Sequence, residues 1–224
     1  MSGTIEFIFD FGSANGYLAY RALPPILART GATLMINPCL LGGIFKATGN
    51  QAPTVAFAGI KGKLDYEMLE IRRFVAKHGL DKFRLNPHFP VNTLMLMRGL
   101  IAARDAGQEA DYLEMGLQGL WEEGLKLDDP QVLAARIDAA GLDSKGLLAA
   151  AQTDRVKLRL ADNTAAAVAR GVFGIPTFFV GDEMFFGKER LGQVEEAVEA
   201  KAAESRSWAG ADPPPGSTIE IRHN

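Results

Sequence analysis

Ser13 is the residue in this chain best placed to do chemistry, because it lies where a predicted strand meets a predicted helix. The strand covers residues 5–9, and the turn Asp10-Phe11-Gly12-Ser13 leads into the helix. A serine at a helix N-terminus can cap free backbone N–H groups, or its hydroxyl can donate a proton to a sulfur anion. The chain has one cysteine, Cys39, so a dithiol cycle within one chain is excluded. Any thiol chemistry at Ser13 therefore needs sulfur from another molecule.

The segment Gly174-Ile175-Pro176-Thr177 is the second candidate, because it leads into a run of β-branched and aromatic residues. This run and another at residues 183–186 predict two strands joined by a tight turn at Gly181-Asp182. A proline at the start of a strand has no N–H group, so the backbone beside it can face a ligand instead of a neighbouring strand. We therefore expect a cis-proline loop at Ile175-Pro176.

The predicted elements run in the order strand–helix–strand, then a long helical block, then strand–strand–helix. The first helix is expected over residues 15–30, with a break at Pro24-Pro25, and the second strand over residues 33–38. No convincing strand is found between Gly42 and Asp162, where apolar residues recur at helical spacing. The predicted helices after the second strand cover residues 55–77, 93–106, 109–122, 130–140, 145–169 and 190–203.

This order predicts an α/β fold, in which a thioredoxin-like domain with the pattern βαβ…ββα is interrupted by a large all-helical insertion. We assign residues 1–42 and 163–204 to the discontinuous thioredoxin-like domain, and residues 43–162 to the insertion. The insertion is large enough to be a domain by itself and would wall a cleft at the active end of the sheet. Residues 205–224 are predicted to be a loose C-terminal tail or to lie on a partner subunit.

Composition excludes several classes of function. The 224 residues are 47% hydrophobic and carry a net charge of −3 without a basic tract, which argues against nucleic acid as a partner. No apolar run approaches the roughly 20 residues that a membrane helix needs, and Asp10 interrupts the apolar stretch near the N-terminus, so no signal peptide is expected. A single cysteine suits a cytoplasmic protein. The three histidines His78, His88 and His223 lack metal-ligand spacing, so we predict no metal site.

Several short motifs are distributed along nearly the whole chain. They are Phe9-Asp10-Phe11-Gly12-Ser13 with Tyr17-Leu18-Ala19, Leu40-Leu41-Gly42-Gly43-Ile44-Phe45 with Gly49-Asn50, Lys63-Leu64-Asp65-Tyr66, Trp121-Glu122-Glu123-Gly124, Gly171-Val172-Phe173-Gly174-Ile175-Pro176-Thr177 and Phe186-Gly187-Lys188-Glu189-Arg190. With these motifs the chain resembles the 2-hydroxychromene-2-carboxylate isomerase family, which is similar to kappa-class glutathione transferases and DsbA-like oxidoreductases. Each motif is weak alone, and the shared order and spacing make the resemblance specific.

The resemblance implies a glutathione-dependent isomerase in aromatic hydrocarbon degradation, active as a homodimer. It would convert 2-hydroxychromene-2-carboxylate, or a related aromatic acid, to trans-o-hydroxybenzylidenepyruvate through a glutathione thiolate adduct. Ser13 matches the family's catalytic serine, which faces the glutathione sulfur. The matches to its glutathione-binding positions are Asn50, Ile175, Pro176, Lys188, Glu189 and Arg190. We select Lys46 and Lys63, from their motif positions, as candidates for binding the substrate carboxylate.

Other functions and roles stay open from the sequence. The same site would suit a kappa-class-like glutathione transferase or peroxidase, in which the thiolate attacks an electrophile. A catalytically silent glutathione-binding relative is a third possibility, because Ala14 and Gly16 replace the proline and serine usual in the family. Ser13 could act only as a helix cap. Asp10 could move protons or stabilise the turn, and Cys39 is expected to be inert core.

Overall fold

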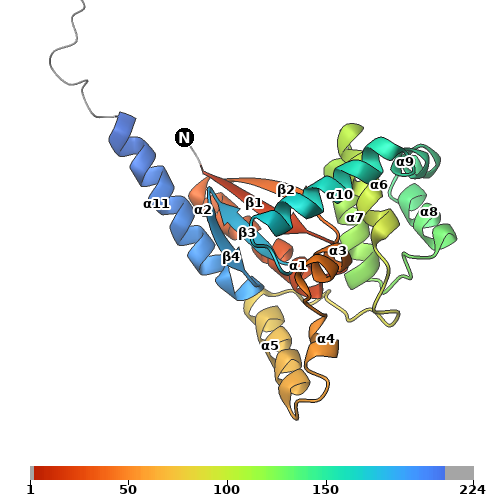
Figure 1. Ribbon diagram of the computed structural model, residues 1–224, viewed down its shortest axis with the longest axis horizontal. Coiled ribbons are helices and arrows are strands. Elements are labelled where there is room, and N and C mark those ends of the chain that lie inside the picture. Colours follow the sequence, from red (N-terminus) through yellow and green to blue (C-terminus); the bar gives the residue numbers. More distant parts are fainter. Residues whose placement is uncertain (1–2, 210–224) are drawn as a thin grey trace, which may run out of the picture.

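Four short strands form one mixed sheet in the computed structural model, which describes residues 3–209 (Figure 1). The strands are β1 (Thr4–Phe9), β2 (Thr33–Pro38), β3 (Thr177–Val180) and β4 (Glu183–Phe186). Their order across the sheet is β2-β1-β3-β4, with β1 parallel to β2 and antiparallel to β3, and with β3 antiparallel to β4. All four strands lie where the sequence predicts them.

Side chains of β1 alternate between two cores, one on each face of the sheet. Phe7 and Phe9 belong to the larger core, and Ile8 belongs to the smaller one. The larger core is covered by α1 (Ala14–Ala22), α2 (Pro24–Thr30) and α11 (Leu191–Ala209), which include the buried residues Leu18, Ile26 and Val194. The smaller core is covered by α3 (Leu41–Thr48) and α10 (Asp154–Ala169).

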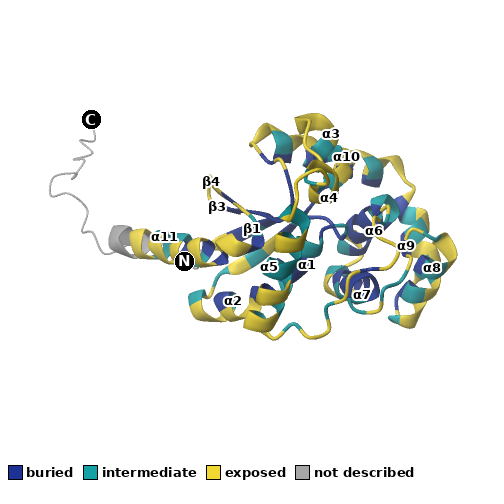
Figure 2. Ribbon diagram, turned by 90° about the horizontal axis from the view of Figure 1, so that it is seen from below, coloured by how far each residue is buried: buried dark blue, intermediate teal, exposed yellow. Residues whose placement is uncertain are grey.

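A block of helices occupies most of the chain between β2 and β3. Its members besides α3 and α10 are α4 (Pro53–Ala56), α5 (Lys63–His78), α6 (Leu94–Asp105), α7 (Glu109–Trp121), α8 (Pro130–Ala139) and α9 (Ser144–Ala151). Figure 2 shows buried residues gathered on α6 and α7, whereas α4 contains no buried residue. The block contains no strand, as predicted. None of the helices in the described part of the chain has the length and apolarity that a bilayer-crossing segment needs.

The structure differs from the predicted helices at four places. The helix expected over 55–77 is two helices, because Gly62 adopts a φ of 79° before α5. The helix expected over 145–169 is also two, since α9 ends at Ala151 and α10 begins at Asp154. Helix α3 was not predicted, because Gly42-Gly43 has low helix propensity and only tertiary packing of Ile44 compensates for it. Helix α11 continues to Ala209, beyond the predicted start of the tail, and residues 210–224 lie outside the described residues.

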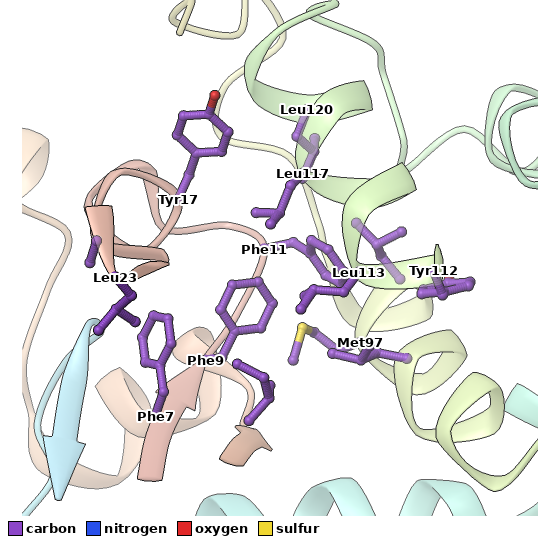
Figure 3. Close-up of a cluster of buried hydrophobic side chains, with 14 of the residues drawn as sticks. Phe7, Phe9, Phe11, Tyr17, Leu23, Met97, Tyr112, Leu113, Leu117 and Leu120 are labelled. Carbon is purple, nitrogen blue, oxygen red and sulfur yellow. The ribbon is translucent and has the colours of Figure 1, made fainter. Parts of the chain in front are cut away.

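The larger core continues from the sheet into the helical block (Figure 3). Phe11, just after β1, joins the two parts of this core. The centre of its ring lies 5.0 Å from the ring centre of Phe9 and 6.4 Å from the ring centre of Tyr112 on α7. In Figure 3 the Phe11 ring points between Leu113 and Met97. Because one core spans both predicted domains, the domain boundaries at 42/43 and 162/163 stay a prediction.

The close contact between Phe11 and α7 leads to a stability prediction. A Cβ atom at Gly116 would lie 2.4 Å from the Phe11 ring, so Gly116→Ala is expected to lower the free energy of unfolding by about 1–3 kcal/mol. Gly42 is also helical and has no atom near its Cβ position, so Gly42→Ala should leave that free energy unchanged or raise it by up to about 1 kcal/mol. Urea unfolding of both variants checks this, and equal stabilities would contradict a tight contact at Gly116.

Candidate active site

The Ser13 hydroxyl joins the start of α1 to the loop before β3. Ser13 is the N-cap of α1, with φ −96° and ψ 109°, and its Oγ accepts a hydrogen bond from Gly16 N at 3.0 Å. The same hydroxyl donates to the carbonyl oxygen of Ile175 at 2.8 Å. Ser13 is buried, so both bonds are shielded from water. The capping role is therefore real, and it places the hydroxyl against the loop that the sequence singles out.

The peptide bond between Ile175 and Pro176 is cis, as predicted. The carbonyl groups of these two residues accept hydrogen bonds from different elements. Ile175 O accepts from Ser13, and Pro176 O accepts from Gly187 N at 2.9 Å. Gly187 has a φ of 102°, a value that favours glycine, and it turns the chain from β4 into the 3₁₀ helix η1 (Lys188–Arg190). Among the described residues, the N–H of Ile175 makes no hydrogen bond.

Asn50 holds the same loop from the opposite side. It follows Gly49, the left-handed C-cap of α3, and its Nδ2 donates to the carbonyl oxygen of Phe173 at 2.7 Å. Its Oδ1 accepts from Gln51 N at 2.8 Å. The structure thus brings Ser13, Asn50 and the segment 173–176 together.

Lys188, Glu189 and Arg190 lie beside this loop but differ in their surroundings. The Lys188 side chain is only 4% exposed, forms an ion pair with Glu189, and places its Nζ 5.4 Å from the ring centre of Phe74. The Glu189 side chain is 48% exposed, and Arg190 is exposed. Glu189 and Arg190 therefore offer charged groups to solvent next to the loop, whereas Lys188 is buried against Phe74 of α5.

A pocket of about 460 Å³ lies behind η1, between α2, α5 and α11. Lys188 and Glu189 line it together with Ile26 and Phe74, whereas Ser13, Asn50 and Ile175 do not. Its charged groups are largely matched within the pocket, for example Arg29 with Glu195 at 2.6 Å and Arg73 with Glu70 at 2.5 Å. The pocket therefore does not mark the Ser13 site, which is defined by the hydrogen-bonded loop.

The two lysines selected for the substrate carboxylate have different surroundings. Lys63 forms an ion pair with Glu67 at 2.7 Å, and its Nζ lies 5.0 Å from the ring centre of Phe57. Lys46 is exposed on α3 and makes no ion pair or hydrogen bond within residues 3–209. Neither lysine is hydrogen-bonded to Ser13 or to the 173–176 loop, so the structure does not bring them into direct contact with the site.

Asp10 is a buried carboxylate that stabilises the turn before Ser13. Oδ1 accepts from Gly12 N at 2.8 Å and from the Thr93 hydroxyl at 2.6 Å, while Oδ2 accepts from Leu41 N at 2.7 Å. Burial raises the pKa of Asp10, and these three hydrogen bonds act in the opposite direction. The geometry supports the turn-stabilising role over proton transfer.

Thr93 and Trp121 are two site-supporting residues that the sequence did not reveal as such. Thr93 bonds to Asp10, and the indole Nε1 of Trp121 donates to Phe11 O at 2.8 Å. Both partners lie far away in the sequence, so no local pattern could pair them.

Cys39 is buried in the smaller core, where burial raises the pKa of its thiol to about 12. The nearby Asp10 and Glu6 charges act in the same direction.

Comparisons with known proteins place these features in context. Residues 4–199 match the DsbA-like thioredoxin domain family. The 2-hydroxychromene-2-carboxylate isomerase of Pseudomonas putida is 30% identical over 87% of this chain and 93% of its own. Human glutathione S-transferase kappa 1 is 25% identical over 94% of this chain and 95% of its own. A solved 2-hydroxychromene-2-carboxylate isomerase structure superposes with a TM-score of 0.76, at 27% identity over 93% of this chain and 100% of that one. The predicted thioredoxin-like fold with a helical insertion is confirmed.

Cys39 is expected to resist alkylation while the protein is folded. With a pKa of about 12, only about one thiol in 10⁵ is ionised at pH 7, and raising the pH to 9 still leaves about one in 10³. Mass spectrometry after iodoacetamide treatment, with and without denaturant, measures this directly. Labelling of the folded protein at the rate of an exposed cysteine would show that the thiol is accessible and ionised.

Proposed function

The chain belongs to the 2-hydroxychromene-2-carboxylate isomerase family of DsbA-like thioredoxin proteins, and from this membership we propose that it is a glutathione-dependent isomerase. Its substrate is 2-hydroxychromene-2-carboxylate or a related aromatic acid, and its product is the ring-opened trans-o-hydroxybenzylidenepyruvate. The observation that carries the proposal is the Ser13 hydroxyl at the N-terminus of α1, bonded to the cis-proline loop.

The residues around the loop fit a tripeptide thiol. The unpaired N–H of Ile175 is a backbone donor for the cysteinyl part of glutathione. Glu189 offers a half-exposed carboxylate to the γ-glutamyl amine, flanked by Lys188 and Arg190. Gly16 lets α1 start close to the loop, because a Cβ atom there would lie 3.1 Å from Ser13 Cβ and 3.4 Å from the Ile175 side chain. Asn50 holds the loop in place at Phe173 O.

Ser13 prepares the site for a sulfur anion. When bound, glutathione supplies a thiolate that can add to a conjugated carbon and later leave, which permits rotation about the former double bond. The Ser13 hydroxyl has one proton, which it donates to Ile175 O in this structure. It can stabilise the sulfur only by turning that proton away from Ile175, while Oγ still accepts from Gly16 N. The positive N-terminal end of α1 lowers the thiol pKa in the same direction.

Lys46 is the better candidate of the two lysines for the substrate carboxylate. It lies on α3, four residues before Asn50, and its charge is not matched by a carboxylate in the described part of the chain. The ion pair with Glu67 already neutralises Lys63.

We also infer a cytoplasmic homodimer from the family resemblance. Exposed apolar side chains on the edge strand β4, Met184 and Phe186, offer a surface for such a contact.

A glutathione transferase is the second candidate function. The kappa-class relatives from human and rat support it, at 25% and 26% identity over 94% of this chain. Both functions need the same thiolate, and they differ in whether glutathione leaves the product. Mass analysis of the product therefore separates them, since an isomer has the mass of the substrate and a conjugate contains glutathione.

Ser13→Ala is expected to lower the glutathione-dependent isomerisation rate about 100- to 1,000-fold, because the thiolate loses its hydrogen-bond donor. The measurement is a spectrophotometric assay of 2-hydroxychromene-2-carboxylate, with and without glutathione. The variant also loses a helix cap, which costs about 1 kcal/mol of stability. Asp143→Ala is the matched control, because Asp143 caps α9 by the same contact, with Gly146 N at 3.0 Å.

The control should lose similar stability and keep its activity. Ser13→Ala activity within a few-fold of wild type would reduce Ser13 to a helix cap. Wild-type protein that binds glutathione but turns over no substrate would instead favour the transferase or a silent relative.

Lys46→Gln is expected to raise the KM for the aromatic acid roughly 10-fold or more, because a charge-assisted hydrogen bond to the carboxylate is lost. The kcat and the glutathione affinity should stay unchanged. Lys63→Gln provides the comparison, and steady-state kinetics with both variants measures the difference. A larger KM increase for Lys63→Gln would reverse the assignment.

A further inference from the structure

We propose that Thr93 and Asp10 are positioning residues, through which the helical block holds the loop that carries Ser13. Thr93 lies at the start of α6, and its hydroxyl donates to the Asp10 carboxylate at 2.6 Å. The catalytic consequence of this contact rests on the proposed function, whereas its effect on the loop does not.

The Asp10 carboxylate is the meeting point of three segments. Gly12 N belongs to the Ser13 loop itself, Leu41 N begins α3, and the Thr93 hydroxyl precedes α6. The backbone of Asp10 also takes part, because Ser13 N donates to Asp10 O at 3.2 Å. Removal of the Thr93 donor thus leaves a carboxylate that is only 1% exposed with two of its three donors, and the turn leading to Ser13 must readjust.

The Thr93 hydroxyl is committed to this contact and not to its own helix. Thr93 is the N-cap residue of α6, a position where threonine usually accepts from a backbone N–H group of the first turn. Here it makes no such cap hydrogen bond, and its backbone angles are φ −88° and ψ 5°. Thr93 is 6% exposed, so water does not compete for the hydroxyl. The geometry therefore favours a role in holding Asp10 over a role in starting α6.

A second contact from the helical block holds the same loop. Trp121 Nε1, at the end of α7, donates to Phe11 O at 2.8 Å, and the Phe11 ring packs against Gly116. Figure 3 shows Phe11 reaching away from the strand toward α7, among Leu113 and Leu117. Residues 10 and 11 are thus held by α6 and α7, while Ser13 contacts the cis-proline loop on the other side.

A small displacement of the loop that carries Ser13 changes the position of the Ser13 hydroxyl. The Oγ–O distance between Ser13 and Ile175 is 2.8 Å, and among the described residues Gly16 N is the one further hydrogen-bond partner of the hydroxyl. A displacement of about 1 Å at a reacting group can lower a rate about 100-fold. Thr93 and Asp10 thereby set the position from which Ser13 meets the sulfur, without touching it.

The test compares two buried threonines whose hydroxyls each make a hydrogen bond to a residue distant in the sequence. Thr93→Val removes the donor to Asp10 with little change in shape. Thr164→Val is the control, because Thr164 Oγ accepts from Leu40 N at 2.9 Å and donates to Leu160 O at 2.7 Å, and within residues 3–209 it makes no hydrogen bond to Asp10 or Ser13. Thr93→Ser restores the hydroxyl. Each variant is compared with wild type by kcat, KM, melting temperature and amide hydrogen exchange over residues 10–16.

We expect Thr93→Val to lower kcat roughly 10- to 100-fold with KM values within about threefold of wild type, and Thr93→Ser to recover most of the loss. Thr164→Val should lower the melting temperature to a similar extent while kcat stays within about twofold of wild type. Equal kcat losses in the two valine variants, or no recovery by serine, would overturn the proposal by showing a general stability effect.

Hydrogen exchange separates the failure of this inference from failure of the proposed function. If wild type does not isomerise the substrate, the proposed function is wrong, yet the loop contact is still measured. Faster exchange at Gly12, Ser13 and Gly16 in Thr93→Val, and not in Thr164→Val, would support positioning. Unchanged exchange at these amides would overturn it.

Discussion

The structure around Ser13 depends on one buried carboxylate. Asp10 connects the end of strand β1 to the beginnings of α3 and α6, because its carboxylate accepts hydrogen bonds from Leu41 N and from the Thr93 hydroxyl. Burial of a carboxylate costs several kcal/mol unless hydrogen bonds replace water. Burial raises the pKa of Asp10 above its value in the unfolded chain. The protein therefore loses stability as the pH rises from the unfolded pKa to the folded pKa of Asp10, and three hydrogen-bond donors offset part of that loss. The turn to Ser13 is held by this balance.

The candidate site is assembled from four segments that are distant in sequence. The Ser13 loop, the end of α3 at Asn50, the cis-proline loop and the start of η1 meet through hydrogen bonds to carbonyl groups of residues 173, 175 and 176. Capping and proposed catalysis are not alternatives for Ser13. The cap orients Oγ. Because the hydroxyl has one proton, it would donate a hydrogen bond either to the loop or to a bound thiolate.

A serine at this position changes what a thioredoxin-like fold can do. The only sulfhydryl, Cys39, is buried, and its pKa of about 12 keeps it protonated. A thiol must then come from a small molecule, for which the loop offers the unpaired N–H of Ile175. The pocket behind η1 does not include Ser13, so the hydrogen-bonded geometry of the loop identifies the site.

Features that depend on neighbours along the chain could be predicted from the sequence alone. These are the four strands, the turn at Gly181, the cis-proline segment, Ser13 just before the start of a helix, and the lack of a dithiol. Helix α3 and the contacts of Thr93 and Trp121 were decided only by tertiary structure. The burial of Lys188 was decided in the same way. The physical reason is that burial and long-range hydrogen bonds override weak local propensities, and their partners cannot be paired from local spacing.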